Sequence, residues 1–69
     1  MEYKLSLKAA RVNANLQQKD VAKALGVSNK TISAWENGDT APRIDQFHAL
    51  CAMYCVPVDA VFFSKNGSL

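Results

Sequence analysis

The sequence has no hydrophobic run long enough to cross a membrane. A membrane-spanning helix takes about 20 consecutive apolar residues, and no stretch of this 69-residue chain approaches that length. The first residues also lack the apolar segment of a secretory signal. We therefore expect no membrane partner and no export, and a cytoplasmic location.

Residues that bind metals or form disulfides are scarce, since the chain has two cysteines and one histidine. Cys51 and Cys55 are four residues apart, which on a helix places them on one face in poor geometry for a disulfide. With only His48 nearby they also make a poor zinc site, so we expect both thiols to be small core residues. The acidic residues are scattered, whereas catalysis needs titratable groups that converge. The sequence predicts no metal, no cofactor, no small-molecule ligand and no enzymatic activity.

The length and composition fit one small folded domain. A composition of 49% hydrophobic and 20% charged residues is ordinary for a globular protein. A chain of this size buries about 60% of the surface that its unfolded form exposes, which leaves a thin margin of stability. We expect a single domain over residues 1–69, with its core within about 5–63 and a frayed tail over 64–69.

The charge is distributed unevenly along the chain. The net charge is +2, but residues 1–30 carry six basic and two acidic side chains, whereas residues 31–69 carry two basic and four acidic ones. The first part thus has a charge of +4 and the second of −2. A basic half can present one positive face to phosphates, although ordinary solvated charges explain the same pattern equally well.

Glycine, proline and asparagine divide the chain into five short segments, none of which alternates with the period of a strand. Apolar residues at helical spacing predict five helices, over about 5–14, 18–25, 29–37, 44–54 and a short one that Pro57 opens. Asn15 and Gly26 follow the first two helices and suit the left-handed conformation that ends a helix. The predicted fold class is all-α. The expected core residues are Leu7, Ala10, Ala14, Val21, Ala22, Leu25, Ile32, Trp35, Phe47, Leu50, Cys51, Tyr54, Val61 and Phe62.

The most informative feature is the spacing between residues 18 and 37. Only Gly26, Val27 and Ser28 separate the second predicted helix from the third. A connection this short forces the two helices to cross steeply and requires a small residue such as Ala22 at the crossing. This spacing is typical of a helix-turn-helix motif.

Three segments in register carry a resemblance to a known family. They are LQQKDVAKALGVS over 16–28, TISAWENG over 31–38 and VPVDAVF over 56–62. The sequence resembles the phage repressor and Cro-like helix-turn-helix regulators, the XRE family, over about 5–63. The resemblance implies a five-helix, lambda-repressor-like fold. It also implies sequence-specific binding of double-stranded DNA by a transcriptional regulator, of the repressor type found in phages and mobile elements.

The resemblance also implies that the third helix enters the DNA major groove as the recognition helix. With Ile32 and Trp35 turned inward, the opposite face reads the bases. Asn29 can pair with adenine and Lys30 can donate to guanine. The complete expected base-reading set is Ser28, Asn29, Lys30, Thr31, Ser33 and Ala34.

Phosphate contacts are expected from the start of the second helix and the end of the third. Gln18 matches the glutamine with which the family clamps the DNA backbone. The complete expected phosphate-binding set is Gln17, Gln18, Lys19, Asn37 and Arg43. The family often has Ser or Thr at the position of Gln17, where it caps the helix. Because Gln is a poor N-cap, we expect this helix end to be looser or capped by another group.

Two further residues match a structural feature of the family. An Arg on the first helix pairs there with the Glu that follows the core residue of the recognition helix, and Arg11 and Glu36 fill these positions. We expect a structural ion pair, and so do not interpret Glu36 as a catalytic acid.

Other functions on the same fold remain as alternatives. A protein-interaction module would show apolar or acidic residues on the outer face of the third helix, where this chain has polar and basic ones. An antitoxin would also need a toxin-binding segment, and little chain follows Phe63. We expect a homodimer on a two-fold operator, with the fifth helix and Phe62–Phe63 as its surface, although Phe63 can equally finish the core.

Overall fold

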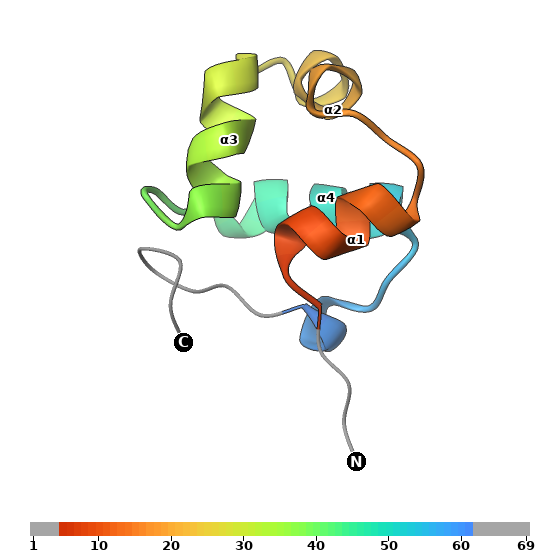
Figure 1. Cartoon of the computed structure of the whole chain (residues 1–69). Coiled ribbons are helices and arrows are strands. Elements are labelled where there is room, and N and C mark those ends of the chain that lie inside the picture. Colours follow the sequence, from red (N-terminus) through yellow and green to blue (C-terminus); the bar gives the residue numbers. More distant parts are fainter. Residues whose placement is uncertain (1–4, 62–69) are drawn as a thin grey trace.

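The computed structural model describes residues 5–61, which fold as a small helical domain (Figure 1). These residues contain four α-helices, a single 3-10 turn and no strand, which confirms the all-α class. The elements are α1 (Leu7–Asn13), α2 (Gln18–Leu25), α3 (Asn29–Asn37), α4 (Ile44–Tyr54) and η1 (Val58–Ala60). None of the helices in this part of the chain is both long and apolar enough to span a bilayer.

The first helix begins two residues later than the sequence suggested. The Ser6 hydroxyl accepts a hydrogen bond from the Ala9 N–H (3.1 Å), so Ser6 caps the N-terminus of α1. Leu5 is instead paired with the other end of the described chain: its N–H donates to the Ala60 carbonyl (2.8 Å), and Leu5 and Val61 form an isolated parallel bridge.

The fifth α-helix is not found among the described residues. After Pro57 the chain makes the single turn η1, and Val61 is already extended. The reason lies in the bridge to Leu5, because it uses the Ala60 carbonyl and directs the buried Val61 side chain into the core. Phe62, Phe63 and the tail over 64–69 lie outside the described residues.

The left-handed helix ends follow the prediction. Asn15 has φ 61° and Gly26 has φ 71°. The Val27 N–H returns to the Ala22 carbonyl (3.0 Å), which closes the end of α2 in the manner common at glycine.

The core draws side chains from all four α-helices and from Val61. The buried apolar residues are Leu7, Ala10, Val21, Ala22, Ile32, Trp35, Leu50, Cys51, Tyr54 and Val61, and Ala14, Leu25 and Phe47 pack against them half-buried.

The expectation for Cys55 is wrong. Cys51 is buried, and burial raises the pKa of its thiol, but Cys55 is exposed. The helix ends at Tyr54 and Cys55 has φ 58°. The helical spacing that would hold both thiols on one face is therefore broken between them.

Candidate nucleic-acid interface

The helix-turn-helix unit is fixed by the short connection between α2 and α3. In Figure 1 α2 is seen nearly end-on while α3 stands upright beside it, so the two helices cross steeply. The left-handed Gly26 makes this turn, and a Cβ built there would meet nothing within 4 Å. Glycine is thus favoured by its backbone conformation and not by crowding. Ala22 is buried and Val27 packs against the core, as a close crossing requires.

The two faces of α3 differ sharply. Ile32 and Trp35 are buried, whereas Asn29, Lys30 and Asn37 are exposed and Thr31, Ser33 and Ala34 are half-buried. The residues predicted to read bases thus lie on the solvent side of a helix whose other side is anchored in the core.

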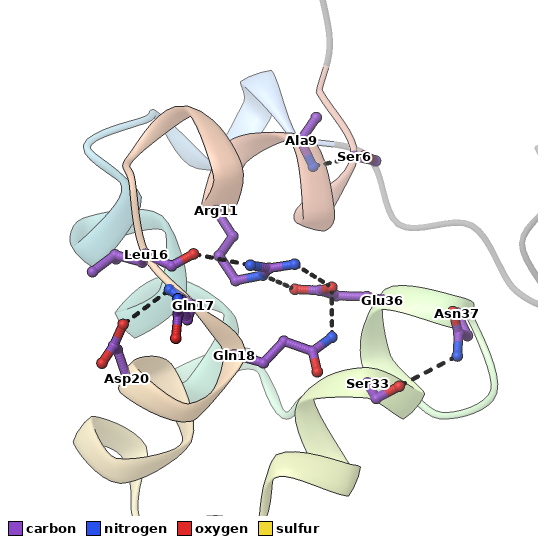
Figure 2. Close-up of polar contacts among 10 residues, drawn as sticks. All are labelled: Ser6, Ala9, Arg11, Leu16, Gln17, Gln18, Asp20, Ser33, Glu36 and Asn37. Atoms are coloured by element: carbon purple, nitrogen blue, oxygen red, sulfur yellow. Dashed lines mark hydrogen bonds and ion pairs between the residues drawn. The ribbon is translucent and has the colours of Figure 1, made fainter.

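Hydroxyl groups at the start of α3 are already engaged with each other. The Ser28 oxygen accepts from the Thr31 N–H (3.1 Å) and lies 2.9 Å from the Thr31 hydroxyl. Ser28 is therefore the N-cap of α3 as well as a predicted base contact. At the other end of the helix the Asn37 amide lies 3.5 Å from the Ser33 hydroxyl (Figure 2), at the limit of a hydrogen bond.

The start of α2 is capped from within the helix. The Gln17 N–H donates to the Asp20 carboxylate (2.9 Å), which supplies the cap that the sequence lacked at Gln17. The N–H groups of Gln18 and Lys19 then remain at the helix end without intrahelical partners. An acidic residue three positions after the N-cap is a capping-box signature, so the sequence contains a signal for the role of Asp20.

The structure brings Arg11 and Glu36 together (Figure 2). The Arg11 Nε donates to Glu36 Oε2 at 2.6 Å and its Nη2 to Oε1 at 3.2 Å. The remaining guanidinium nitrogen, Nη1, donates to the Leu16 carbonyl (2.9 Å), which ties α1 to the segment that enters α2. The Arg11 pKa is raised, first by its hydrogen bond to Glu36. The guanidinium thus joins α1, α3 and the entry to α2.

Gln18, predicted as a phosphate contact, joins the same cluster. Its amide Nε2 donates to Glu36 Oε1 (3.0 Å), as Figure 2 shows. The other amide hydrogen and the amide oxygen are not used in this bond. Glu36 thus links the core pair to the helix end where phosphate was expected, a contact that no local sequence signal indicates.

Arg43, the last predicted phosphate contact, lies at the other end of the motif. It precedes α4, where its N–H donates to the Gln46 side chain (2.9 Å). Its guanidinium pairs with Asp45, with Nε 3.1 Å from Oδ1. This pair lowers the Asp45 pKa, first through the hydrogen bond from Arg43.

The solvent-exposed charge of the motif is positive. Lys19, Lys23 and Lys30 are exposed on α2 and α3 against the exposed Asp20, while Glu36 is neutralised by Arg11. Within residues 5–61 no three His, Cys, Asp or Glu side chains gather as a metal site would require.

The profile of the helix-turn-helix family matches residues 7–61. The chain belongs to this family. Its match covers all four helices and the turn between α2 and α3, which confirms the resemblance drawn from the sequence.

Three curated relatives are each about one-third identical to the chain. An HTH-type transcriptional activator of Enterococcus faecalis is 32% identical over 96% of this chain and 32% of its own length. A cryptic-phage CTXphi transcriptional repressor of Vibrio cholerae is 35% identical over 70% of this chain and 43% of its own length. An uncharacterized HTH-type transcriptional regulator of Methanocaldococcus jannaschii is 37% identical over 91% of this chain and 96% of its own length. The chain therefore spans less than half of the first two relatives. No solved structure matches it significantly.

Proposed function

We propose that the protein is a transcriptional regulator that binds double-stranded DNA sequence-specifically, with α3 in the major groove. The observation that carries the proposal is the division of α3 into a core-anchored face and a polar, basic face. A helix held this way presents its side chains in fixed positions, as base recognition requires. The names of the three relatives agree with this class of function.

Asn29 and Lys30 make the principal base contacts. Both are exposed in the first turn of α3, the part that recognition helices direct to base edges. Each bidentate contact of this kind is worth about 1–3 kcal/mol of discrimination. Thr31, Ser33, Ala34 and the capping Ser28 complete the surface, with the hydroxyls adjusting to either base type.

The phosphate contacts flank α3. The free N–H groups at the start of α2 attract an anion, and Gln17 and Lys19 are exposed beside them. Gln18 is oriented by Glu36, which leaves its second amide hydrogen for a phosphate oxygen. Asn37 and Arg43 extend the contact beyond the other end of α3. These residues set the affinity and its salt dependence but not the sequence preference.

The regulator acts as a repressor in the cytoplasm, where its DNA ligand lies, and binds a two-fold operator as a homodimer. Occupying a promoter is sufficient for repression, so no further activity of the domain is needed. Specificity also favours two half-sites, because two-fold operators mirror two-fold proteins. The function requires no catalysis, and we propose none.

The decisive experiment selects duplexes from a random library at two salt concentrations. We expect enrichment of one sequence class, with affinity that falls as salt rises because phosphate binding releases counterions. No enrichment and no salt-dependent binding would exclude DNA as the ligand and leave the protein-interaction alternative.

Single substitutions then test the assignment of base contacts. Asn29→Ala and Lys30→Ala should each lower the preference for the selected duplex over a scrambled one by roughly 5- to 150-fold. Lys23→Ala is the matched control, since it removes the same charge from an exposed position on α2, and it should leave that preference unchanged. Equal losses of affinity in Lys30→Ala and Lys23→Ala, with the sequence preference unchanged in all three variants, would mean that charge alone binds the DNA.

A further inference from the structure

The helix α3 ends in an asparagine followed by a glycine. Asn37 is its last residue, and Gly38 caps it with φ 81°. That left-handed conformation favours glycine, so the cap itself places a residue without a side chain after Asn37. The other asparagines of residues 5–61 all precede residues with side chains; they are Asn13, Asn15 and Asn29. Among these four positions, the backbone nitrogen after Asn37 is thus the least hindered.

We propose that Asn37 is a site of spontaneous deamidation and that the carboxylate formed there weakens the binding of DNA. The consequence for DNA rests on the proposed function, because Asn37 is one of the expected phosphate contacts. The reaction itself is a property of the helix end and can be measured without DNA.

The reaction needs only water. The backbone nitrogen of Gly38 attacks the side-chain carbonyl carbon of Asn37, and the bond from that carbon to Nδ2 breaks. The proton of the Gly38 N–H leaves with Nδ2 as ammonia, and a cyclic succinimide remains. Water then opens the ring at either carbonyl, which gives an aspartyl or an isoaspartyl residue at position 37. The net change is the exchange of an amide for a carboxylate, with no oxidant or reductant.

The side chain of Asn37 is free to react. It is exposed, and within residues 5–61 its amide makes one side-chain hydrogen bond, to the Ser33 hydroxyl at 3.5 Å (Figure 2). A contact of this length holds an amide weakly. The Gln18 amide, in contrast, is held by Glu36 at 3.0 Å. The leaving nitrogen of Asn37 is therefore in contact with water, and its carbonyl carbon can rotate toward the backbone.

The backbone of the helix end controls the rate. Ring closure requires the Asn37 Cβ and the Gly38 nitrogen to be eclipsed about the Cα–C bond, whereas a helical ψ of about −42° holds them apart. The Gly38 N–H also donates to the Trp35 carbonyl (3.3 Å), and the Asp39 N–H donates to the Ala34 carbonyl (2.9 Å). Both bonds belong to the last turn, and helix ends open at a lower cost than the whole domain unfolds. Deamidation therefore proceeds through opening of this turn, more slowly than in the unfolded chain.

The product places a negative charge where it is least favourable. The C-terminal end of a helix carries a partial negative charge, so a carboxylate there is disfavoured. The exposed Asp39, two residues further on, adds a like charge. Next to a phosphate in water, the new carboxylate lowers the affinity for DNA by roughly fivefold. The isoaspartyl form also lengthens the backbone by one methylene, which disrupts the cap at Gly38.

The first experiment follows the modification by mass. The full chain is incubated at neutral pH, folded or in urea, and then cleaved with trypsin. Cleavage after Lys30 and Arg43 releases residues 31–43, whose only carboxamide is that of Asn37. Asn66, which also precedes a glycine, lies outside the described residues and in another tryptic peptide.

We expect this peptide to become modified in the folded chain, at a rate several-fold below that in urea. No modification of the folded chain by the time that the urea sample is converted overturns the proposal. Equal rates in the two samples overturn the control of the reaction by the helix end.

The second experiment tests the consequence for DNA with three variants. Asn37→Asp carries the charge of the product and should bind the selected duplex roughly fivefold more weakly than the wild type. Asn13→Asp is the matched control, because Asn13 is likewise the exposed last residue of a helix, and it should keep the wild-type affinity. Asn37→Gln keeps the carboxamide on a longer side chain that does not form the succinimide. It should hold its initial affinity through an incubation that lowers the affinity of the wild type.

The outcomes separate this inference from the proposed function. Equal losses in Asn37→Asp and Asn13→Asp, or equal losses on incubation of the wild type and Asn37→Gln, overturn the consequence for DNA and leave the DNA-binding function intact. Absence of any selected duplex overturns that function, while the mass of residues 31–43 still decides whether Asn37 is modified.

Discussion

Two arginine–carboxylate pairs occur among residues 5–61, and they differ in almost every respect but chemistry. Arg11 and Glu36 lie 25 residues apart on α1 and α3, meet at 2.6 Å and have side chains only 10% and 4% exposed. Arg43 and Asp45 lie two residues apart at the start of α4, meet at 3.1 Å and are 73% and 68% exposed. We call them the inner pair and the outer pair.

The difference shows what burial does to the same chemical contact. Ions removed from water are costly unless they are paired and fully hydrogen-bonded, and Arg11 meets this condition with Glu36 and the Leu16 carbonyl. The inner pair therefore holds α3 against α1 and against the segment that enters α2. Exposed pairs contribute little to stability because water and salt screen them, so the outer pair is available for ligands and partners.

The largest expected effect comes from breaking the inner pair. Arg11→Ala leaves the Glu36 carboxylate buried without its cation, and such losses cost about 3–5 kcal/mol. Small domains have only about 5–15 kcal/mol of stability in total, so we expect a large fall in the urea midpoint, measured by circular dichroism.

The double variant Arg11→Met, Glu36→Met separates charge burial from packing. Replacing both partners by apolar groups is often neutral, so it should be more stable than Arg11→Ala. If Arg11→Ala cost no more than an exposed substitution, the inner pair would not hold the fold.

The next effect concerns Tyr54, which is buried and influenced by both residues of the inner pair. Burial, and then the Glu36 charge, raise its pKa from 10.0 to about 12. The unfolded chain loses this proton near pH 10 and the folded chain only near pH 12, so the folded state is favoured fully below pH 10. Stability then falls as the pH rises toward 12.

Alkaline unfolding measured by circular dichroism checks this expectation. Tyr54→Phe removes the ionisable group and should flatten the fall in stability between pH 10 and 12. An identical alkaline profile for the wild type and Tyr54→Phe would show that Tyr54 ionises as freely in the folded chain as in the unfolded one.

A smaller effect is expected from Gln18, which joins the inner pair to the start of α2. Gln18→Ala removes a hydrogen bond to a buried carboxylate, and bonds to charged groups contribute about 1.5–3 kcal/mol. Gln18 is half-buried, so we expect the low end of that range in urea unfolding. Gln17→Ala should leave stability unchanged because Asp20 supplies the cap. Equal losses in both variants would place the effect at the helix end and not at Glu36.

The same contrast explains what could be predicted from the sequence. The buried faces of α2 and α3, the turn at Gly26 and the partners Arg11 and Glu36 all follow from periodicity, turn chemistry or a family pattern. In each case the local structure requires a particular residue type at a particular position, so the sequence alone carries the signal. The structure confirms the all-α class and the match to the helix-turn-helix family confirms the family, while the roles of the DNA-contacting residues remain predictions.

The features that the sequence did not reveal depend on contacts between distant or weakly determined groups. The bond from Gln18 to Glu36 spans 18 residues and has no periodic signature. The fifth helix was replaced by η1 because Leu5, at the other end of the domain, takes the Ala60 carbonyl. Cys55 is exposed because its left-handed backbone, with φ 58°, takes it off the face that carries Cys51. The spacing argument assumes that the helix continues through Cys55, although the predicted helix already ends at Tyr54.

The smallest effect on stability is expected from the outer pair, and it completes the comparison. Arg43 lowers the Asp45 pKa, so any stability from the pair is present at neutral pH and lost as the pH falls through that lowered value. Because both side chains are exposed, Asp45→Asn should leave the urea midpoint and the acid-unfolding profile unchanged.

Arg43→Ala should likewise preserve folding but reduce the salt dependence of DNA binding by about one counterion. A loss of stability comparable to that of Arg11→Ala would mean that exposure does not distinguish the pairs. An unchanged salt slope would remove Arg43 from the phosphate contacts.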